Sequence, residues 1–332
     1  RPHSRRRTAV RILAPLAASA AVVAMAVGIS LHNGSPSHRA PIAAGHTSGP
    51  TRFPSSTPPT TPAPTTLPAG AKPVHVALAM KDGSQVGVGM PVVAYFSRDI
   101  TNGVALQQAT TVKVNGKSVE AAWYFEAGTV QPGYPMQGHL RMDAYWPAHA
   151  AIQVSVPAAG LSAGTGLAFD DSVSLTFTTG AKTVATVDDK THKLTVTSDG
   201  KPLGVFPVSL GSPSTPTSSG TKVIMAKGAA ICMTGPGYHD CGVKYTQRLT
   251  ADGEYLHAAP WNVKNIAAGI DSSNGCTNLT TADAKRLYGV MEIGDIVRYP
   301  NATGPKMSPT DGLGDWNVPW PKWLTGGLAP TR

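Results

Sequence analysis

The chain has 332 residues, more than one compact core usually needs, which predicts two domains and additional non-globular segments. Only 14% of the residues are charged, whereas glycine (35) and proline (29) are abundant, and this favours short strands and turns over long helices. The net charge of +9 is concentrated in residues 1–52, which hold seven arginines, no lysine and no acid. In the rest of the chain, positive and negative charges nearly cancel and form no basic stripe, so nucleic acid is excluded as a partner.

Residues 1–31 have the pattern of an export signal. Arg5-Arg6-Arg7 and Arg11 precede an uncharged run from Ile12 to Leu31, which is long enough to span the ~30 Å of bilayer hydrocarbon. Two interpretations stay open: a signal peptide cleaved at a small-residue site, or a retained signal anchor. Both predict that the remaining chain lies outside the cytoplasm and contacts the membrane only through this segment.

Residues 32–70 are rich in proline, serine and threonine and have hardly any large apolar side chains. Pro58-Pro59 and the prolines at 62 and 64 predict extended polyproline II structure. Such a segment cannot form a core. We interpret it as a stalk that holds the folded part away from the membrane; a flexible linker is the alternative.

Residues 71–180 are predicted to form a β-sandwich. Apolar and polar residues alternate in several short runs, and Asn115-Gly116 after one of them is a strong hairpin signal. The runs are Val74–Leu78, Val92–Phe96, Val112–Val114, Ile152–Val156 and Val173–Phe177. Asp170-Asp171 is either a metal pair or a turn cap, and no catalytic constellation stands out here.

A second β-rich region covers residues 181–300, and a tryptophan-rich extension covers 301–332. Val184–Val187 and Lys193–Val196 flank a turn and predict a hairpin. One short helix is expected at 280–288, with Thr280 as N-cap and Asp283 at the third helical position. The fold is therefore predicted to be mainly β, with a sandwich followed by a second β-rich domain.

Three cysteines in an exported chain are an odd number, which favours one disulfide and one free thiol. Cys232 and Cys241 lie close in sequence and can pair across a loop or hairpin, which leaves Cys276 unpaired. The alternative is that Cys232 and Cys241 are both reduced and packed.

Cys276 and His257 form the candidate catalytic pair. A thiol attacks as the thiolate, and an imidazole nearby lowers its pKa by forming an ion pair. Gly275 allows a sharp turn, so that its N–H and that of Cys276 can point at one spot and form an oxyanion hole. The alternative for Cys276 is a buried, inert cysteine.

These residues resemble the L,D-transpeptidase family. His257, a gap of 15 residues and then Ser273-Asn274-Gly275-Cys276-Thr277-Asn278 are similar to the family signature, in which a histidine usually stands where this chain has Asn274. Ser214–Gly220 is similar to the family's Thr-Pro-x-Gly loop. Asp311–Trp316 and Trp320 resemble the C-terminal extension of members that carry an immunoglobulin-like domain, which implies such a domain at 71–180.

The resemblance implies roles for individual residues. Cys276 is expected to be the nucleophile and His257 the base, with the carbonyl of Ala258 as third member and the N–H groups of Gly275 and Cys276 as oxyanion hole. Asn278, Trp261, Asn274, Ser273, Tyr238 and Met233 are expected to line the substrate groove. For Asn278, Trp261, Met233 and Tyr238, simple packing is the alternative.

The implied reaction is acyl transfer between peptidoglycan stem peptides, which produces 3→3 cross-links in the cell wall. Carbapenem-type β-lactams are implied as covalent inhibitors. No cofactor and no metal is required. An L,D-carboxypeptidase with water as acceptor and a catalytically inactive peptidoglycan-binding module are the alternatives, and the Asn274 departure keeps the second of these open.

Overall fold

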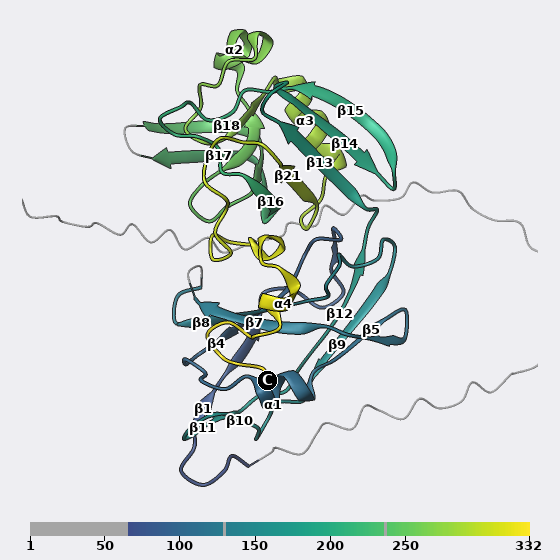
Figure 1. Ribbon diagram of the computed structural model, residues 1–332, viewed down its shortest axis with the longest axis vertical. Helices are drawn as coiled ribbons and strands as arrows, with labels where there is room; N and C mark the ends of the chain where they lie inside the picture. The colour runs from purple at the N-terminus through teal and green to yellow at the C-terminus, as the bar shows by residue number, and fades with distance from the viewer. Residues whose placement is uncertain (1–65, 129–130, 236–237) are drawn as a thin grey trace, which may run out of the picture. The chain divides into compact units, whose positions relative to one another are not determined.

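The structure of the protein, a computed structural model, describes residues 66–128, 131–235 and 238–332 (Figure 1). The predicted signal segment and nearly all of the predicted stalk lie outside the described residues. Within the described part, no helix is long and apolar enough to cross a membrane. The chain is mainly β, as predicted, and its longest described helix is α3 (Thr281–Val290).

The first half of the described chain forms a sandwich of two larger sheets with a small third sheet. The larger sheets have the strand orders β2-β4-β8-β7 and β3-β12-β9-β5-β6, and the small one is β1-β11-β10. Large side chains between the sheets, among them Phe96, Trp123 and Phe177, are fully buried. The elements are β1 (Lys72–Val74), β2 (Val76–Leu78), β3 (Gln85–Val86), β4 (Val92–Phe96), α1 (Val104–Ala109), β5 (Thr111–Val114), β6 (Lys117–Val119), β7 (Ala122–Ala127), β8 (Met136–Arg141), β9 (Ala151–Val156), β10 (Ser162–Gly164), β11 (Leu167–Phe169) and β12 (Val173–Thr179).

The predicted hairpin turn at Asn115-Gly116 is confirmed, because both residues have a positive φ and join β5 to β6. The single strand expected at 74–78 is wrong. It breaks at His75, so that β1 pairs with β11 while β2 pairs with β4 in another sheet. The alternation of apolar residues is the same in one strand or two, and only the pairing partners distinguish them.

The second half contains a five-stranded sheet, β15-β14-β13-β21-β16, and a four-stranded sheet, β17-β18-β19-β20. A separate apolar core, which includes Phe206, Leu256 and Leu287, lies between these sheets and α3. The elements are β13 (Thr183–Asp188), β14 (Lys193–Ser198), β15 (Lys201–Pro207), β16 (Gly220–Val223), β17 (Ala226–Gly235), β18 (Tyr238–Arg248), β19 (Tyr255–Ala258), η1 (Pro260–Asn262), α2 (Val263–Ala268), β20 (Thr277–Leu279), α3 and β21 (Ile296–Tyr299).

Helix α3 begins as the sequence predicts. The Thr280 hydroxyl accepts a hydrogen bond from the N–H of Asp283, and the Asp283 carboxylate accepts one from that hydroxyl. The short helix α2 was not predicted. Only Ile266 of its residues is buried, so the sequence shows no repeating apolar face there.

The C-terminal extension contains η2 (Asp315–Asn317) and α4 (Trp320–Trp323). The guanidinium of Arg141, on β8, lies 4.6 Å from the ring centre of Trp316 and 4.1 Å from that of Trp323, and it donates to the carbonyl of Val318. The side chain of Asn317 bonds both N–H and C=O of Thr221, on β16. The extension therefore contacts the sandwich and the second β-rich region.

Candidate active site

Strands β19 and β20 bring His257 and Cys276 together. They pair in parallel with His257 opposite Asn278, and β20 begins one residue after Cys276. Paired residues face the same side of a sheet, as do alternate residues of one strand, so His257, Asn278 and Cys276 share a face. All three line a cavity of about 160 Å³, together with Met233, Tyr238, Asp240, Val243, Trp261, Asn262, Ser272, Ser273 and Asn274.

The segment before Cys276 is held by side chains of the 211–217 loop. The hydroxyl of Thr215 donates to the carbonyl of Ser273, and that of Thr217 donates to the carbonyl of Gly275, both at 2.9 Å. Gly275 has a φ of +101°, a conformation that L side chains rarely adopt. The sharp turn is thus at Gly275, as expected, and Asn274 has no positive φ.

His257 is buried, and its hydrogen bond fixes the tautomer. Nδ1 lies 3.0 Å from the carbonyl oxygen of Ala258. Because a carbonyl only accepts, Nδ1 carries the hydrogen and Nε2 of the neutral ring is left as an acceptor. Burial lowers the pKa of His257, so the ring stays neutral at pH 7. Trp261 stacks beside it, with ring centres 6.0 Å apart.

Cys276 is only 7% exposed, and its thiol donates to the carbonyl of Gly253 at 3.6 Å. Burial raises the pKa of the thiol to about 12; the N–H of Tyr255 acts against this shift, and the Glu254 carboxylate adds to it. Burial therefore favours a neutral thiol and a neutral imidazole. Desolvation disfavours both charged forms, so it opposes the ion pair expected from the sequence.

A buried ion pair lies behind the Gly275 turn, and sequence reasoning missed it. Lys222, on β16, is fully buried; it contacts the Glu254 carboxylate and lies 4.0 Å from the ring centre of Tyr299. Glu254 also accepts hydrogen bonds from the N–H and the hydroxyl of Ser218. The Tyr299 hydroxyl bonds that of Thr277, the residue after the thiol. No local sequence pattern relates positions 222 and 254, so only the fold reveals the pair.

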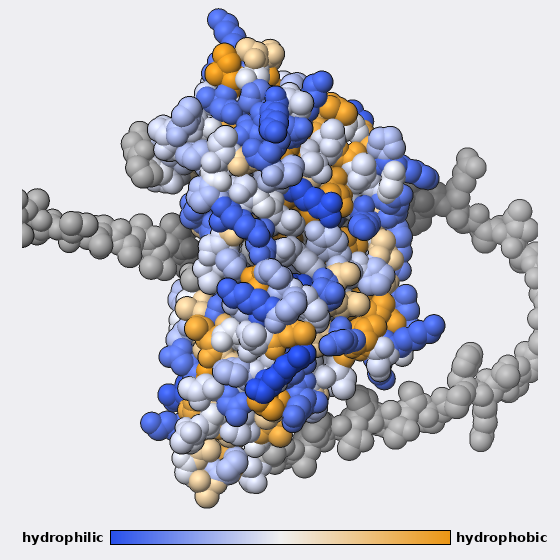
Figure 2. Space-filling view, in the orientation of Figure 1, coloured by the Kyte–Doolittle hydropathy of each residue, from blue (hydrophilic) through white to orange (hydrophobic). Residues whose placement is uncertain are grey.

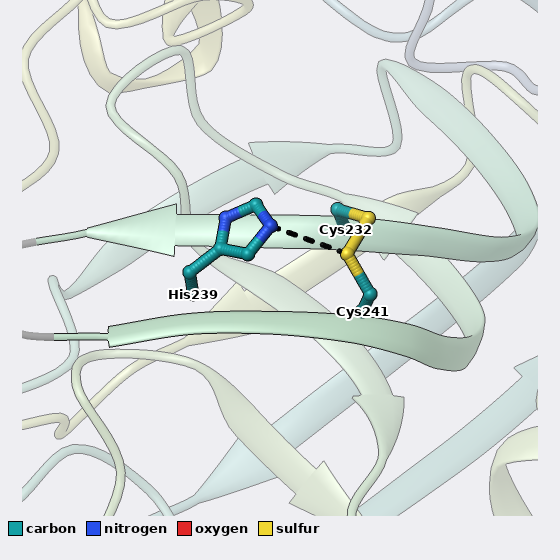
Figure 3. Close-up of side chains that lie close together, drawn as sticks. All are labelled: Cys232, His239 and Cys241. Atoms are coloured by element: carbon teal, nitrogen blue, oxygen red, sulfur yellow. Dashed lines mark hydrogen bonds between the residues drawn. A yellow bond between two sulfur atoms is a disulfide. The ribbon is translucent and has the colours of Figure 1, made fainter.

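The β17–β18 hairpin covers the thiol. Its residues Met233 and Tyr238 line both the first cavity and a second cavity of about 480 Å³, which also borders Glu254, Asn274 and Gly275. Cys232 and Cys241 form a disulfide across this hairpin (Figure 3). His239 lies next to it, with Nε2 3.4 Å from Sγ of Cys241. Cys276 is the remaining free cysteine.

The other expected groove residues differ in their surroundings. Asn278 is buried, and its Oδ1 has no hydrogen-bond partner among the described residues. Ser273 donates to the carbonyl of Cys276 at 2.6 Å, a bond that shapes the turn. Asn274 is exposed and borders both cavities. Trp261 is 63% exposed. Val263 and Ile270, at the two ends of α2, are exposed apolar residues as well, and Figure 2 shows a small orange patch near its top, bordered by blue residues.

Comparisons with known proteins agree with this geometry. Residues 182–298 match the YkuD L,D-transpeptidase catalytic domain, and residues 57–162 match a bacterial Ig domain. Probable L,D-transpeptidase 3 of Mycobacterium tuberculosis is 30% identical over 246 residues, which are 65% of this chain and 82% of that protein. The chain belongs to the L,D-transpeptidase family.

Two other similar members of the L,D-transpeptidase family show how far the likeness extends. L,D-transpeptidase 2 of M. tuberculosis is 32% identical over 254 residues, which cover 74% of this chain and 60% of that protein. The chain thus spans about six-tenths of that relative's length. The structure of LD transpeptidase LdtMt1 in complex with imipenem is similar with a TM-score of 0.55 at 26% identity, covering 68% of this chain and 98% of that one.

Proposed function

We propose that this protein is an extracytoplasmic, cell-wall L,D-transpeptidase that joins peptidoglycan stem peptides through a thioester on Cys276. The observation that carries the proposal is the pairing of β19 with β20, which places the buried thiol and an imidazole with a free Nε2 in one cavity. Family membership supplies the reaction class.

In the first half-reaction, Sγ of Cys276 attacks the carbonyl of the diamino acid at the third position of a donor stem. The thiol proton passes to Nε2 of His257, so no free thiolate is needed beforehand. When the intermediate collapses, the C–N bond breaks and His257 returns the proton to the leaving D-alanine. The carbonyl of Ala258 stabilises the imidazolium that exists between these steps, because it accepts from Nδ1.

In the second half-reaction, a side-chain amine of a neighbouring stem attacks the thioester. The C–S bond breaks, His257 takes the proton of the amine and returns it to the thiol, and a 3→3 cross-link results. In both half-reactions, the protons are taken up and returned by His257 and Cys276, and no step uses a metal or cofactor.

The N–H groups of Gly275 and Cys276 are proposed to hold the oxyanion. Neither N–H donates to an acceptor among the described residues, and the Gly275 conformation is fixed by the bond from Thr217. Two such donors stabilise a tetrahedral intermediate by a few kcal/mol each, on the order of what single oxyanion-hole donors contribute in other enzymes. The unpartnered Oδ1 of Asn278 is suited to accept an N–H of the donor stem.

Carbapenems are proposed to acylate the same thiol, since the similar structure of LdtMt1 holds imipenem. The hairpin residues Met233 and Tyr238 and the exposed Trp261 are proposed to contact the bound stem or drug from above and from the rim. The predicted N-terminal segment would supply any contact with the membrane.

The proposal is tested by incubating full-length protein with a disaccharide-tetrapeptide and analysing the products by mass spectrometry. Cross-linked dimer is expected, with loss of all turnover and of the carbapenem adduct in Cys276→Ala. The matched control is the Cys232→Ser/Cys241→Ser double variant, which keeps Cys276 and should keep the adduct. Only shortened monomer would show a carboxypeptidase instead, and turnover in Cys276→Ala would refute the assigned nucleophile.

A further inference from the structure

The second β-rich region contains a cluster of three potential metal ligands, which are Asp189, His192 and Asp271. Asp189 and His192 lie in the turn between β13 and β14, and Asp271 lies between α2 and Cys276. Nδ1 of His192 is 3.8 Å from Oδ1 of Asp189 and 3.6 Å from Oδ1 of Asp271. All three potential ligand atoms lie within 4.8 Å of one another.

Neighbouring groups hold the three residues of this cluster in place. The N–H of Leu210 donates to Oδ1 of Asp271 at 2.7 Å, and the N–H of Asp189 donates to Oδ1 of Asn301 at 3.0 Å. The ring of His192 packs against Gly269, where even a Cβ atom would come within 2.6 Å of the ring. The surroundings thus fix the Asp271 carboxylate, the His192 ring and the backbone at Asp189, which preorganises the group.

The cluster is not satisfied by the protein alone. Asp189 is only 8% exposed, and its Oδ1 has no hydrogen-bond partner among the described residues; the same holds for the buried Nδ1 of His192. A buried carboxylate oxygen and a ring nitrogen that face each other without a partner are costly to maintain. A bound cation would satisfy both at once.

We propose that Asp189, His192 and Asp271 form a binding site for a zinc-class divalent metal ion that ties the β13–β14 turn to the segment carrying Cys276. One imidazole nitrogen and two carboxylate oxygens are a donor set that suits Zn²⁺, whereas Mg²⁺ and Ca²⁺ prefer oxygen alone. The ion has a structural role and takes no part in acyl transfer.

The two separations from the His192 nitrogen fit this choice of metal. Ligands at about 2.0–2.1 Å around a tetrahedral ion lie roughly 3.3–3.4 Å apart, so the distances of 3.6 and 3.8 Å need to shrink by only a few tenths of an ångström. The side chains of His192 and Asp271 are 23% and 21% exposed, which leaves a route for entry and a place for water as fourth ligand.

The other clusters of this kind among the described residues lack these features. His75, Asp170 and Asp171 lie on the sandwich, His75 is more than half exposed, and its Nδ1 already contacts Asp171. The sulfur atoms of Cys232 and Cys241, beside His239, are joined to each other. The first of these clusters therefore serves as an internal control.

The test is a cobalt titration of the full chain carrying Cys276→Ala, with the disulfide kept oxidised, so that no thiol competes for metal. We expect one Co²⁺ per chain with the visible absorption of a four-coordinate site, displaced by Zn²⁺ but not by millimolar Mg²⁺ or Ca²⁺. Asp189→Asn and His192→Gln should each weaken Co²⁺ binding at least tenfold, whereas His75→Gln should leave it unchanged.

Circular dichroism before the titration shows whether each variant is folded. If Asp189→Asn is not, Asp271→Asn replaces it, because its amide oxygen can still accept from Leu210. Absence of Co²⁺ binding to the Cys276→Ala protein would overturn the proposal. So would equal affinity in the parent and in the variants of Asp189, His192 and Asp271, or a loss of binding in His75→Gln.

Discussion

Replacement of Lys222 by methionine is the sharpest test of how the Gly275 turn is supported. Lys222 is fully buried, so the change leaves the Glu254 carboxylate without its cation in a largely buried position. Breaking a buried ion pair by removing one partner costs about 3–5 kcal/mol. Glu254 keeps two hydrogen bonds from Ser218 and a small exposed area, which places the expected loss near the lower end, about 3 kcal/mol.

Thermal unfolding measures this loss. For a folded part of this size, about 3 kcal/mol corresponds to a fall in Tm of roughly 6–12 °C. The matched control is the Lys222→Met/Glu254→Gln double variant, in which no charge is left unpaired and the amide still accepts from Ser218. Its Tm should lie closer to that of the unaltered protein than the Tm of Lys222→Met does.

Single replacements of Lys222 and of Glu254 should act on the thiol in opposite directions. Lys222 lowers the pKa of Cys276 and Glu254 raises it, so Lys222→Met should slow alkylation of Cys276 by iodoacetamide at a fixed pH, and Glu254→Gln should speed it. Equal alkylation rates in both single variants, or a fall in Tm of less than about 2 °C in Lys222→Met, would refute the view that this pair supports the nucleophile.

Four further predictions concern the site and its supports. Asn274→His should change kcat/KM by no more than roughly tenfold, about 1.4 kcal/mol, because Asn274 is exposed. His257→Asn should instead lower kcat/KM by several orders of magnitude. If the unaltered protein were inert and Asn274→His restored its activity, the roles assigned to residues 257 and 274 would be wrong. Burial lowers the pKa of His257, so the neutral imidazole persists to lower pH. In a plot of kcat/KM against pH, the fall in activity on the acid side should therefore have its midpoint below pH 6.5, and a midpoint above pH 6.5 would contradict this reasoning. Removing the disulfide with Cys232→Ser/Cys241→Ser should lower the stability of the hairpin by about 2–3 kcal/mol, as measured by hydrogen exchange. Peptide mapping of the unaltered protein without reduction would disprove the pairing if it found free thiols at both positions. Trp323→Ala should destabilise the fold by about 3–5 kcal/mol in urea without changing kcat/KM, since the side chain is buried against Ala122 and Arg141 of the sandwich, which holds none of the proposed site residues. An equal loss of activity would show that the extension does more than support the fold.

The sequence predicts those elements whose signal is local. The turn at Asn115-Gly116 and the N-cap at Thr280 each depend on residues a few positions apart, and both occur as expected. The break at His75 depends on which strands are available for pairing far along the chain. Helix α2 depends on contacts of a single buried residue, Ile266. Neither the break at His75 nor helix α2 therefore leaves a repeating pattern in the sequence.

The candidate site also has features that the sequence predicts and features that it does not. His257, Gly275 and Cys276 could be proposed because they form a spaced motif. The charge state of the thiol could not, because it follows from burial and from the carbonyl of Gly253. Lys222 with Glu254, and His192 with Asp271, come from positions well separated in the chain, so nothing short of the folded arrangement relates them.

The protonated, covered state of Cys276 has a consequence for the durability of the protein. In an oxidising compartment, where a disulfide such as Cys232–Cys241 can persist, an accessible thiolate would oxidise to sulfenic and then sulfinic acid. A thiol that is 7% exposed, with its hydrogen directed to Gly253, presents little sulfur anion to peroxide. Under the proposed mechanism, the thiol becomes reactive only when an acyl donor fills the cavity and His257 removes the proton. The free thiol of this protein should therefore be lost to oxidation only slowly.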